Sequence, residues 1–336
     1  MLIDFRSDTV TRPSPGMLDS MMNAPVGDDV LGDDPSVIEL EEYSAQLFEM
    51  ESALFCPSGT MTNQIAIKCL TQPGDEVICD GSSHIYQYEG GGIAFNSGAS
   101  VQLLTGQQGR INAAQVKSAI NTDDVYKANT SLVSIENTAN RGGGSCYEFE
   151  EIKGIRGICD EHNLSLHLDG ARLFNALIAK NEEAKEYGRT FHSISICLSK
   201  GLGAPVGSVL LGSKSFIKKA RRIRKVFGGG MRQAGYMAAA GLYALQNNIA
   251  RLRIDHDHAK IIENALHQKG LDVLPVETNI IIFNAPAPYK PTDIVAMLKE
   301  HNILAYAISA TQVRFVVHLD ITPKMIDQTI STIKNF

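Results

Sequence analysis

The stretch SISICLSKGLGAPVGSVLLG, residues 193–212, decides the fold, because it joins two apolar runs through one cation and a glycine-rich turn. The runs 193–198 and 206–211 are typical of strands that are buried on both faces. Lys200 follows the first run, and no acidic residue stands beside it in the sequence. A lone ammonium at such a place loses hydration and gains no local partner. Two interpretations follow: Lys200 lies in an exposed loop, or it is not a free ammonium in the working protein.

Before residue 193 the sequence also contains short apolar runs, and these are separated by segments with a helical pattern. A helix is expected from about residue 35, where Asp34 can cap it and Pro35 suits its first position. This alternation predicts an α/β fold whose large domain holds a mainly parallel seven-stranded sheet. The five further strands are expected at 53–56, 76–79, 101–104, 131–136 and 165–169.

The pattern of predicted strands and helices changes after about residue 245. A long polar helical segment, 247–269, leads into NIIIF at 279–283, a helix after Pro291, VRFVVHL at 313–319 and a last helix. This order predicts a smaller α+β domain at the C-terminus. We therefore expect a large domain over residues 1–246, including the N-terminal segment, and a small domain over 247–336.

Composition excludes several classes of protein. The chain has 336 residues and a formal net charge of −6, which argues against a general nucleic-acid binder. The N-terminus lacks the features of a signal peptide, and no apolar run approaches the length of a membrane span. The cysteines form no CxxC pair, so we expect reduced core residues in a cytoplasmic protein. The six are Cys56, Cys69, Cys79, Cys146, Cys159 and Cys197.

Two charged clusters have simple structural interpretations. The acids Asp28, Asp29, Asp33 and Asp34 resemble a cation loop but lack EF-hand spacing, so caps and turns explain them and no metal is expected. The stretch 218–232 carries seven basic residues in fifteen. Its apolar residues fall on one helical face, which favours a solvated amphipathic helix over a nucleic-acid site.

Polar residues at the predicted strand ends mark the expected site, because ligands of open α/β sheets bind at the carboxyl ends of strands. In CPSGTMTNQIAI, a strand, a tight turn and a helix start together favour a bound phosphate. No GxGxxG follows a strand and no P-loop motif is present. A lysine, an acid and a phosphate cradle are the set that pyridoxal phosphate needs. The polar strand exits are Ser58-Gly59-Thr60, Glu136-Asn137, Asp169 and Lys200.

Six motifs extend this pattern over nearly the whole chain: DFRSDTVTRPSPGML, PVGDDVLGDDP, PSGTMTNQ, LHLDGARLFNA, SKGLGAPVGSVLLGS and RKVFGGGMRQAG. In this order they resemble the threonine aldolase family, whose members are pyridoxal phosphate enzymes of the aspartate-aminotransferase-like fold. The resemblance implies cleavage of L-threonine or L-allo-threonine to glycine and acetaldehyde, through an external aldimine that displaces Lys200. It also implies a homotetramer built from dimers that share active sites.

The resemblance implies a role for each matching residue. Lys200 carries the Schiff base, Asp169 meets the pyridinium nitrogen and His84 stacks on the ring; these three are the expected catalytic residues. An arginine suits a carboxylate because its planar fork meets both oxygens. The other expected contacts are Ser58, Gly59, Thr60 and Arg232 at the phosphate, Arg172 toward both cofactor and substrate, and Ser7, Arg314 and Tyr126 at the substrate.

Three positions depart from the family pattern. Ala139 stands in ENTAN where many members have a histidine, Tyr126 aligns with a second histidine, and Leu31 replaces a common tyrosine. The first two changes alter how the substrate hydroxyl is held, since a tyrosine of ordinary pKa is a poor base at neutral pH. We therefore expect low specificity at the β-carbon.

Other functions remain open on the residues alone. The nearest alternative is β-elimination from a 3-hydroxy amino acid on the same cofactor, which yields a keto acid and ammonia. Another is an aldolase for a bulkier aryl or an acidic substrate. An alternative from a different class is a non-catalytic binding or assembly protein that kept the fold, and it predicts no bound cofactor.

Overall fold

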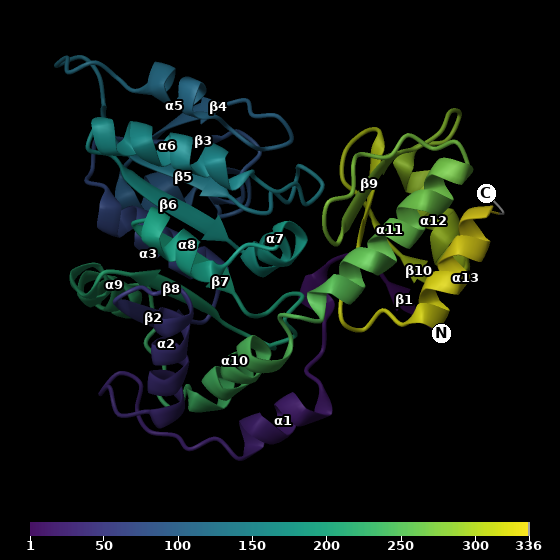
Figure 1. The fold of residues 1–336 in the computed structure, drawn as a ribbon, viewed down its shortest axis with the longest axis horizontal. Coiled ribbons are helices and arrows are strands. Elements are labelled where there is room, and N and C mark those ends of the chain that lie inside the picture. Colours follow the sequence, from purple (N-terminus) through teal and green to yellow (C-terminus); the bar gives the residue numbers. More distant parts are fainter. Residues whose placement is uncertain (335–336) are drawn as a thin grey trace.

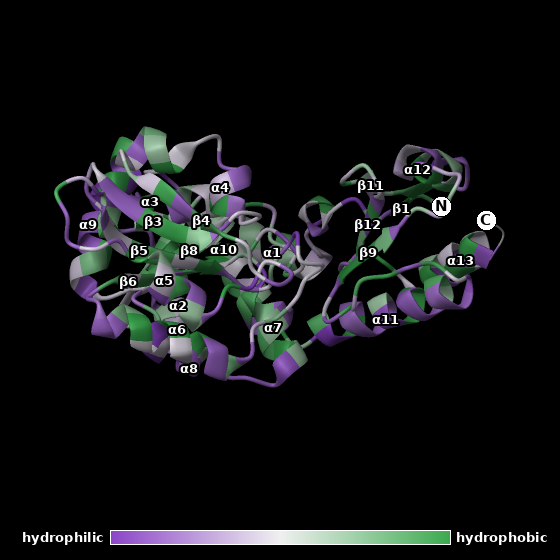
Figure 2. Cartoon of the chain, turned by 90° about the horizontal axis from the view of Figure 1, so that it is seen from above, coloured by the Kyte–Doolittle hydropathy of each residue, from purple (hydrophilic) through white to green (hydrophobic). Residues whose placement is uncertain are grey.

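The computed structural model describes residues 1–334, and these form two parts that each enclose a sheet and a hydrophobic core (Figure 1). The larger part holds the helices and strands between Pro15 and Asn247, and the smaller part holds the C-terminal elements together with the N-terminal strand Ile3–Asp4. Figure 2 shows hydrophobic residues on β5 and β8 inside the larger part and hydrophilic residues along the outer side of α11.

The larger part is built on a seven-stranded sheet of order β2-β8-β7-β6-β5-β3-β4. Strands β4, β3, β5, β6 and β7 run parallel, whereas β8 pairs antiparallel with both β2 and β7. The expected mainly parallel sheet and its seven strands are confirmed. The strands are β2 Ser52–Cys56, β3 Asp75–Asp80, β4 Ser100–Leu104, β5 Asn129–Glu136, β6 Ser165–Gly170, β7 Ser193–Cys197 and β8 Ser208–Gly212.

The antiparallel β8 follows from the short connection at residues 198–207. A parallel neighbour needs a crossover of about a dozen residues or more, usually a helix. The turn after Lys200 is shorter than that, and it contains Gly203 and Gly207, whose positive φ angles let the chain reverse. The sheet direction around Lys200 is therefore set by this turn.

Helices cover both faces of the sheet. Residues Leu54 and Cys56 of β2 pack with α3 and α9 on one face, whereas Ala53 and Phe55 belong to the core that includes α2 and α10. Asp34 caps α2 by accepting a hydrogen bond from the Val37 amide, as expected. The helices of this part are α1 Pro15–Met22, α2 Pro35–Leu47, α3 Gly59–Leu70, α4 His84–Gln87, α5 Ala113–Ala119, α6 Phe149–Glu161, α7 Leu173–Lys180, α8 Ala184–Thr190, α9 Lys214–Val226 and α10 Gly235–Asn247, with short turns at Asp8–Val10 and Ile93–Ser97.

The smaller part combines short strands with three helices. Its main sheet is antiparallel in the order β11-β12-β9, and β1 pairs parallel with β10. The expected α+β character is confirmed. The elements are β1 Ile3–Asp4, β9 Ile280–Asn284, β10 Ile303–Leu304, β11 Tyr306–Ala307 and β12 Gln312–Val316, with α11 Leu252–Gln268, α12 Pro291–Glu300 and α13 Pro323–Lys334.

The N-terminal strand lies with the C-terminal elements. Ile3 and Phe5 belong to the core of the smaller part, and the Phe5 ring stacks on Phe315 with centroids 5.1 Å apart. The chain therefore starts in the smaller part before it enters the larger one. We propose that the domain boundary lies close to residue 246, with the segment around Ile3 assigned to the small domain.

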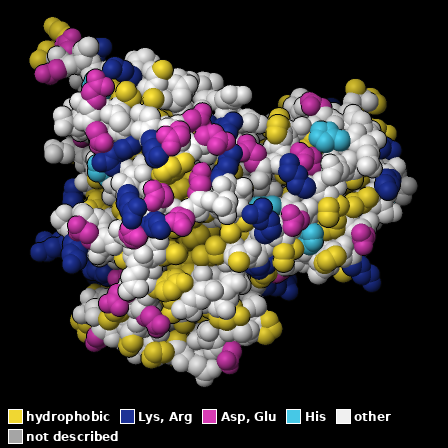
Figure 3. Space-filling model, in the orientation of Figure 1, with side chains coloured by type: hydrophobic (Ala, Val, Ile, Leu, Met, Phe, Trp, Pro, Cys, Tyr) yellow, Lys and Arg dark blue, Asp and Glu magenta, His cyan; other side chains and the backbone are white. Residues whose placement is uncertain are grey.

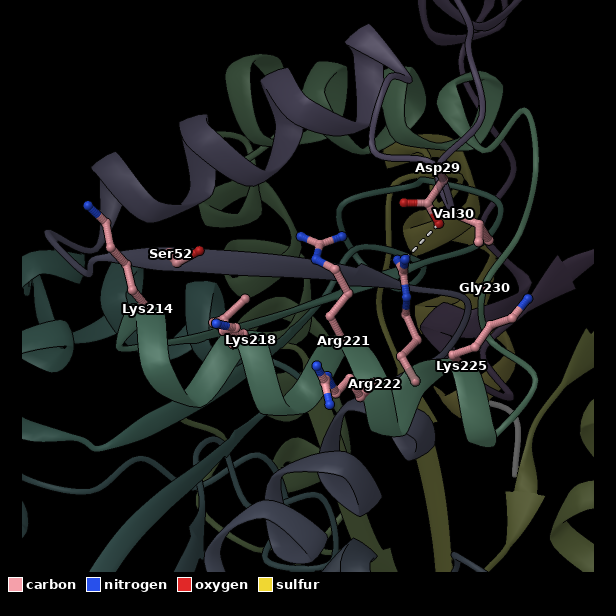
Figure 4. A pocket seen from close by; sticks show the side chains of 11 residues that line it. Asp29, Val30, Ser52, Lys214, Lys218, Arg221, Arg222, Lys225 and Gly230 are labelled. Carbon is pink, nitrogen blue, oxygen red and sulfur yellow. Dashed lines mark ion pairs between the residues drawn. The ribbon is translucent and has the colours of Figure 1, made fainter.

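Helix α9 buries the apolar face expected from the sequence. Ile217 and Ala220 are buried against α3 and β2. Arg224 is buried as well and pairs with Asp29 at 2.9 Å, the contact drawn dashed in Figure 4. Five other cations of α9 line a hollow of about 510 Å³ beside β2. These are Lys214, Lys218, Arg221, Arg222 and Lys225.

The acidic loop near residue 30 is held together by protein partners. Asp28 accepts the Val30 amide and pairs with Arg232, and Asp33 accepts the Asp28 amide. Asp34 caps α2, so turns, caps and ion pairs account for these acids.

The six cysteines are buried and unpaired, as expected. Among the described residues no helix is both long and apolar enough to cross a membrane. Figure 3 shows charges of both signs interspersed over one face of the molecule.

Candidate active site

The polar residues expected at strand ends gather at one edge of the large sheet. Asp169 is the next-to-last residue of β6, Glu136 ends β5, and Lys200 follows β7. Because β2 also runs parallel to these strands, Ser58 reaches the same edge. A cavity of about 370 Å³ lies nearby, between the larger part and the strands β11 and β12.

Asp169 is buried and receives two hydrogen bonds. Its Oδ2 accepts from Asn63 Nδ2 at 2.9 Å, and its Oδ1 accepts from the Ala171 amide at 3.1 Å. These two N–H donors fix both oxygens of the Asp169 carboxyl group at the end of β6.

The orientation of Asn63 is set by a buried histidine. Burial lowers the pKa of His167 to about 4, so its imidazole is neutral near pH 7 and has one donor and one acceptor nitrogen. His167 Nε2 lies 3.2 Å from Asn63 Oδ1, and Nδ1 lies 2.8 Å from Ser193 Oγ. Since the amide oxygen can only accept, Nε2 must be the donor. This contact turns the Asn63 amide nitrogen toward Asp169.

His84 is oriented by Glu89, which the sequence did not single out. His84 Nδ1 lies 2.9 Å from Glu89 Oε1, and Glu89 also accepts from Asn63 and Gln64. Burial alone would lower the pKa of His84, but the hydrogen bond to Glu89 and the charge of Asp169 raise it. The Nε2 atom has no hydrogen-bond partner among the described residues, and His84 lines the cavity. His84, Glu89 and Asp169 bring ligand atoms within 4.8 Å of one another, and amide donors already occupy both carboxylates.

Glu136 is a second carboxyl group that the sequence marked only as a strand exit. Its two oxygens accept from the backbone amides of His84 and Asn140, each at 2.8 Å. Burial and the charge of Asp169 raise the pKa of Glu136 to about 7. Glu136 therefore ties the loop after β5 to the start of α4 and places His84.

Lys200 is half-buried in the turn after β7. None of the ion pairs found within residues 1–334 involves it. Its charge is nevertheless among the influences on the pKa values of Asp8 and His84, which places it within the same polar cluster.

The turn from β2 into α3 has the form of an anion cradle. Ser58 caps α3 by accepting from the Met61 amide at 3.2 Å. The first amides of a helix have no acceptor within it, so the 12-residue α3 presents donors at Gly59 and Thr60. Ser208 Oγ is buried without a partner among the described residues, 3.4 Å from the point where a Cβ on Gly59 would lie. These unpaired donors fit a phosphate group.

The three residues expected at the substrate carboxylate differ in whether protein groups already bind their polar atoms. Arg172 Nε and Nη2 each donate to Asp8 at 2.7 Å. Burial would raise the pKa of Asp8, but the charge and hydrogen bonds of Arg172 hold it at about 2. Ser7 Oγ accepts from the Thr9 amide and caps a short turn. The guanidinium fork of Arg172 is thus already bound within the protein.

Arg314 is the free arginine of the set. Its Nη1 donates to Asn140 Oδ1 at 3.0 Å and its Nη2 donates to the Arg6 carbonyl at 3.1 Å, so both partners are neutral. Its Nε is buried with no partner among the described residues. Burial, together with the charge of Arg172, lowers the pKa of Arg314 to about 10. The Arg314 guanidinium has lost hydration on burial and has no counter-ion in its place. A carboxylate ligand would therefore stabilise its charge.

Two expected site residues are not brought to this cluster within the chain. Arg232 is exposed and pairs with Asp28 at 2.9 Å. Tyr126 is 92% exposed in the loop before β5. That loop enters β5 at Asn129, the end opposite Glu136, and an eight-residue strand spans roughly 25 Å. Ala139 is buried and bonds through its backbone to Ser145.

Four residues of the cluster had no assigned role in the sequence: Asp8, Asn63, Glu89 and Glu136. Asn63 lies one helical turn after Gly59, on the face of α3 that points to β6, which is a weak signal at best. Asp8 and Arg172 are joined only by tertiary folding. No local pattern distinguishes Asp8 and Glu89 from ordinary core or surface positions, whereas Glu136 was marked by its place at a strand end.

An α/β sheet with a lysine, an aspartate and an anion cradle at its strand ends defines a pyridoxal-phosphate-type enzyme fold, and comparisons with known proteins agree. The chain matches the beta-eliminating lyase family over residues 4–287. It is 44% identical to the low specificity L-threonine aldolase of Escherichia coli K12 over 322 residues, which cover 96% of this chain and 95% of the relative.

Solved structures share the fold. The threonine aldolase of Leishmania major superposes with a TM-score of 0.86 at 23% identity and covers 99% of both chains. A structure of SPT with PLP superposes with a TM-score of 0.79 at 14% identity, covering 99% of this chain and 87% of the other. The chain therefore belongs to the beta-eliminating lyase family, as a homologue of the low-specificity L-threonine aldolases.

Proposed function

We propose that this protein is a pyridoxal-phosphate-dependent aldolase that cleaves L-threonine and L-allo-threonine to glycine and acetaldehyde. The observation that carries the proposal is the position of Asp169 and Lys200 at the same ends of the neighbouring parallel strands β6 and β7. None of the ion pairs found within residues 1–334 involves Lys200. The identity to E. coli low specificity L-threonine aldolase supports the substrate.

The residues at the strand ends fit the cofactor. Lys200 would hold it through its amine, Asp169 at the ring nitrogen, His84 on the ring face, and Ser58, Gly59 and Thr60 at the phosphate. The unpaired Ser208 hydroxyl and the free amides of α3 support this fit. When bound, pyridoxal phosphate supplies an electron sink for the electron pair of the broken Cα–Cβ bond.

The protein's own residues orient the substrate and move its proton. Arg314 binds the α-carboxylate, and this contact sets which bond at Cα stands perpendicular to the ring plane. His84 Nε2 holds or accepts the proton of the β-hydroxyl, since Nδ1 is committed to Glu89. Asn63 holds the Asp169 carboxyl group in place by donating to its Oδ2 atom.

The decisive experiment measures aldehyde release from L-threonine, L-allo-threonine and L-phenylserine by the purified holoenzyme. Acetaldehyde and glycine in equal amounts from the first two substrates support the proposal. The beta-eliminating lyase match keeps elimination as the second candidate. A keto acid and ammonia, without aldehyde, would replace the aldolase with an eliminating lyase.

We also propose that the enzyme is a homotetramer. Large hydrophobic side chains on the surface support an assembly, among them Leu31, Phe95, Val125, Tyr126 and Val226. Light scattering on the purified protein tests this directly. A cytoplasmic location is proposed as well, because the six buried thiols are unpaired.

A further inference from the structure

The cavity between the two parts of the molecule carries more positive charge than a simple amino acid needs. Two of its lining residues are arginines, Arg141 and Arg314, and none is an acid. The full lining is His84, Tyr88, Asn140, Arg141, Tyr306, Ala307, Ile308 and Arg314. A substrate with one carboxylate satisfies one of these arginines and leaves the other without an anion.

Arg141 is held in place by neutral groups. Its Nε donates to the Tyr88 hydroxyl, and its Nη1 donates to the Ile308 carbonyl at 3.0 Å. The guanidinium carbon lies 5.1 Å from the centre of the Tyr88 ring. None of the ion pairs found in the described part of the chain includes Arg141. The side chain is therefore oriented from both parts of the molecule while its charge stays unneutralised.

Arg314 is in the same situation on the other wall. Its partners are an amide oxygen and a carbonyl, and its Nε has no partner among residues 1–334. Arg172, the third arginine nearby, is neutralised by Asp8. Burial and the charges of Arg172 and Arg141 disfavour the charged form of Arg314. Two like charges held at one cavity are stabilised together only when anions enter it.

We propose that the cavity accepts β-hydroxy amino acids whose β-carbon carries a second carboxylate, with Arg314 on the α-carboxylate and Arg141 on the side-chain carboxylate. The four-carbon member of this class is 3-hydroxyaspartate. The inference rests on the proposed aldol cleavage for its chemistry but not for its binding geometry. Tyr88 is the positioning residue, because its hydroxyl and ring hold the Arg141 guanidinium.

The cleavage of such a substrate is balanced without any co-reactant. The Cα–Cβ bond breaks, and its electron pair stays with Cα, which then gains a proton. The β-hydroxyl loses its proton as the β-carbon becomes an aldehyde. The products of 3-hydroxyaspartate are glycine and glyoxylate, and no atom is oxidised or reduced by an outside partner.

The first test measures binding without turnover. L-Aspartate and L-asparagine have the same shape, lack the β-hydroxyl and differ in side-chain charge. Titrated into the holoenzyme and followed by calorimetry, L-aspartate should bind at least about tenfold more tightly, as expected for charge-assisted hydrogen bonds. The variant Arg141→Met should abolish the difference, and Tyr88→Phe should reduce it. The exposed Arg253, which donates to the Ile178 carbonyl, gives the matched control Arg253→Met, which should keep the difference.

The second test follows glyoxylate release from L-3-hydroxyaspartate. In Arg141→Met, kcat/KM for this substrate should fall at least about tenfold more than kcat/KM for L-threonine. Equal affinity of the parent enzyme for L-aspartate and L-asparagine overturns the inference. An equal loss of affinity for L-aspartate and L-asparagine in Arg141→Met also overturns it, since that result indicates a structural role for Arg141.

The two proposals fail in different ways. If L-threonine yields no aldehyde but L-aspartate still binds selectively through Arg141, the reaction is wrong and the subsite stands. If L-threonine is cleaved but the preference for L-aspartate is missing, the subsite is wrong and the reaction stands.

Discussion

Asp8 and Arg172 form a two-pronged ion pair that fastens the N-terminal segment to the end of β6. Both hydrogen bonds measure 2.7 Å, and both side chains are buried. The pair engages the fork of Arg172 inside the protein and leaves Arg314 as the arginine without a counter-ion. Arg172 and Arg314 were both expected at the substrate carboxylate, but Arg172 forms an internal ion pair whereas Arg314 has no counter-ion.

The ion pair predicts acid sensitivity. The pKa of Asp8 is depressed to about 2 in the folded protein, from 3.8 as the ordinary value. Its stabilisation is fully present above about pH 4 and is lost as the pH falls through about 2, where the folded carboxylate is protonated. The contribution is roughly 2 kcal/mol. The free energy of unfolding, measured in urea from pH 2 to 5, should rise more steeply with pH in the parent protein than in Asp8→Asn. The exposed Asp257 provides the control, and an unchanged slope in Asp8→Asn would contradict the assignment.

Substitution of Arg314 and substitution of Arg172 should affect different properties of the enzyme. Arg314→Leu should raise KM for L-threonine by about a hundredfold while thermal stability changes little, because a charge-assisted contact to substrate is lost. Arg172→Leu should instead lower stability by about 3–5 kcal/mol, since it leaves Asp8 buried and unpaired. Michaelis constants and unfolding curves of both variants check this. A stable Arg172→Leu with a raised KM would reverse the two roles.

Lys200 should be the covalent attachment point of the cofactor. Borohydride reduction of the holoenzyme should fix the cofactor to the peptide that contains Lys200, and Lys200→Ala should show no attachment. The reason is the position of this amine at a strand end with no acid partner. Mass spectrometry of the digest reads the site. Attachment to any other lysine sinks the assignment.

The contact from His167 to Asn63 should matter for catalysis and not only for folding. His167→Phe frees the Asn63 amide to turn, which removes the N–H donor from Asp169 Oδ2 and brings an amide oxygen toward it. We expect kcat to fall about tenfold and cofactor affinity to drop. His256 donates to Asn175 in the same way, and burial lowers its pKa to about 4 as well, but no carboxylate bonds that amide in the described structure. His256→Phe should therefore cost stability and leave kcat near the parent value. Equal losses of kcat in both variants would make His167 merely structural.

Selectivity at the β-carbon should be low. Ala139 offers no side-chain hydrogen bond, and Tyr126 does not reach the strand-end cluster within its own chain. The proposed contact to the hydroxyl then falls to His84, whose Nδ1 is engaged by Glu89 and whose Nε2 has no partner among the described residues. Both L-threonine and L-allo-threonine should be cleaved with a ratio of kcat/KM below about a hundred, which corresponds to less than about 3 kcal/mol. A higher ratio in the parent enzyme, unaltered in Tyr126→His, would defeat this expectation.

Much of the fold follows from local patterns. Apolar runs at residues such as 131–136 and 165–169 became β5 and β6, and Asp34 with Pro35 began α2 as expected. Such features depend on near neighbours in the chain, so hydrophobic periodicity and capping chemistry are enough to predict them. The N-terminal strand was less predictable, because β1 is two residues long and its partner β10 lies 300 residues away.

The sequence by itself determined the layer architecture, the strand-end placement of Lys200 and Asp169 and the anion cradle at Gly59, because strand direction alone brings these positions to one edge. Only the tertiary structure decided that Arg172 is neutralised by Asp8, that Asn63 is turned by His167, and that Arg141 and Arg314 line one cavity without an acid. Each of these contacts joins residues that are far apart in the chain, and their energies depend on burial and charge in three dimensions.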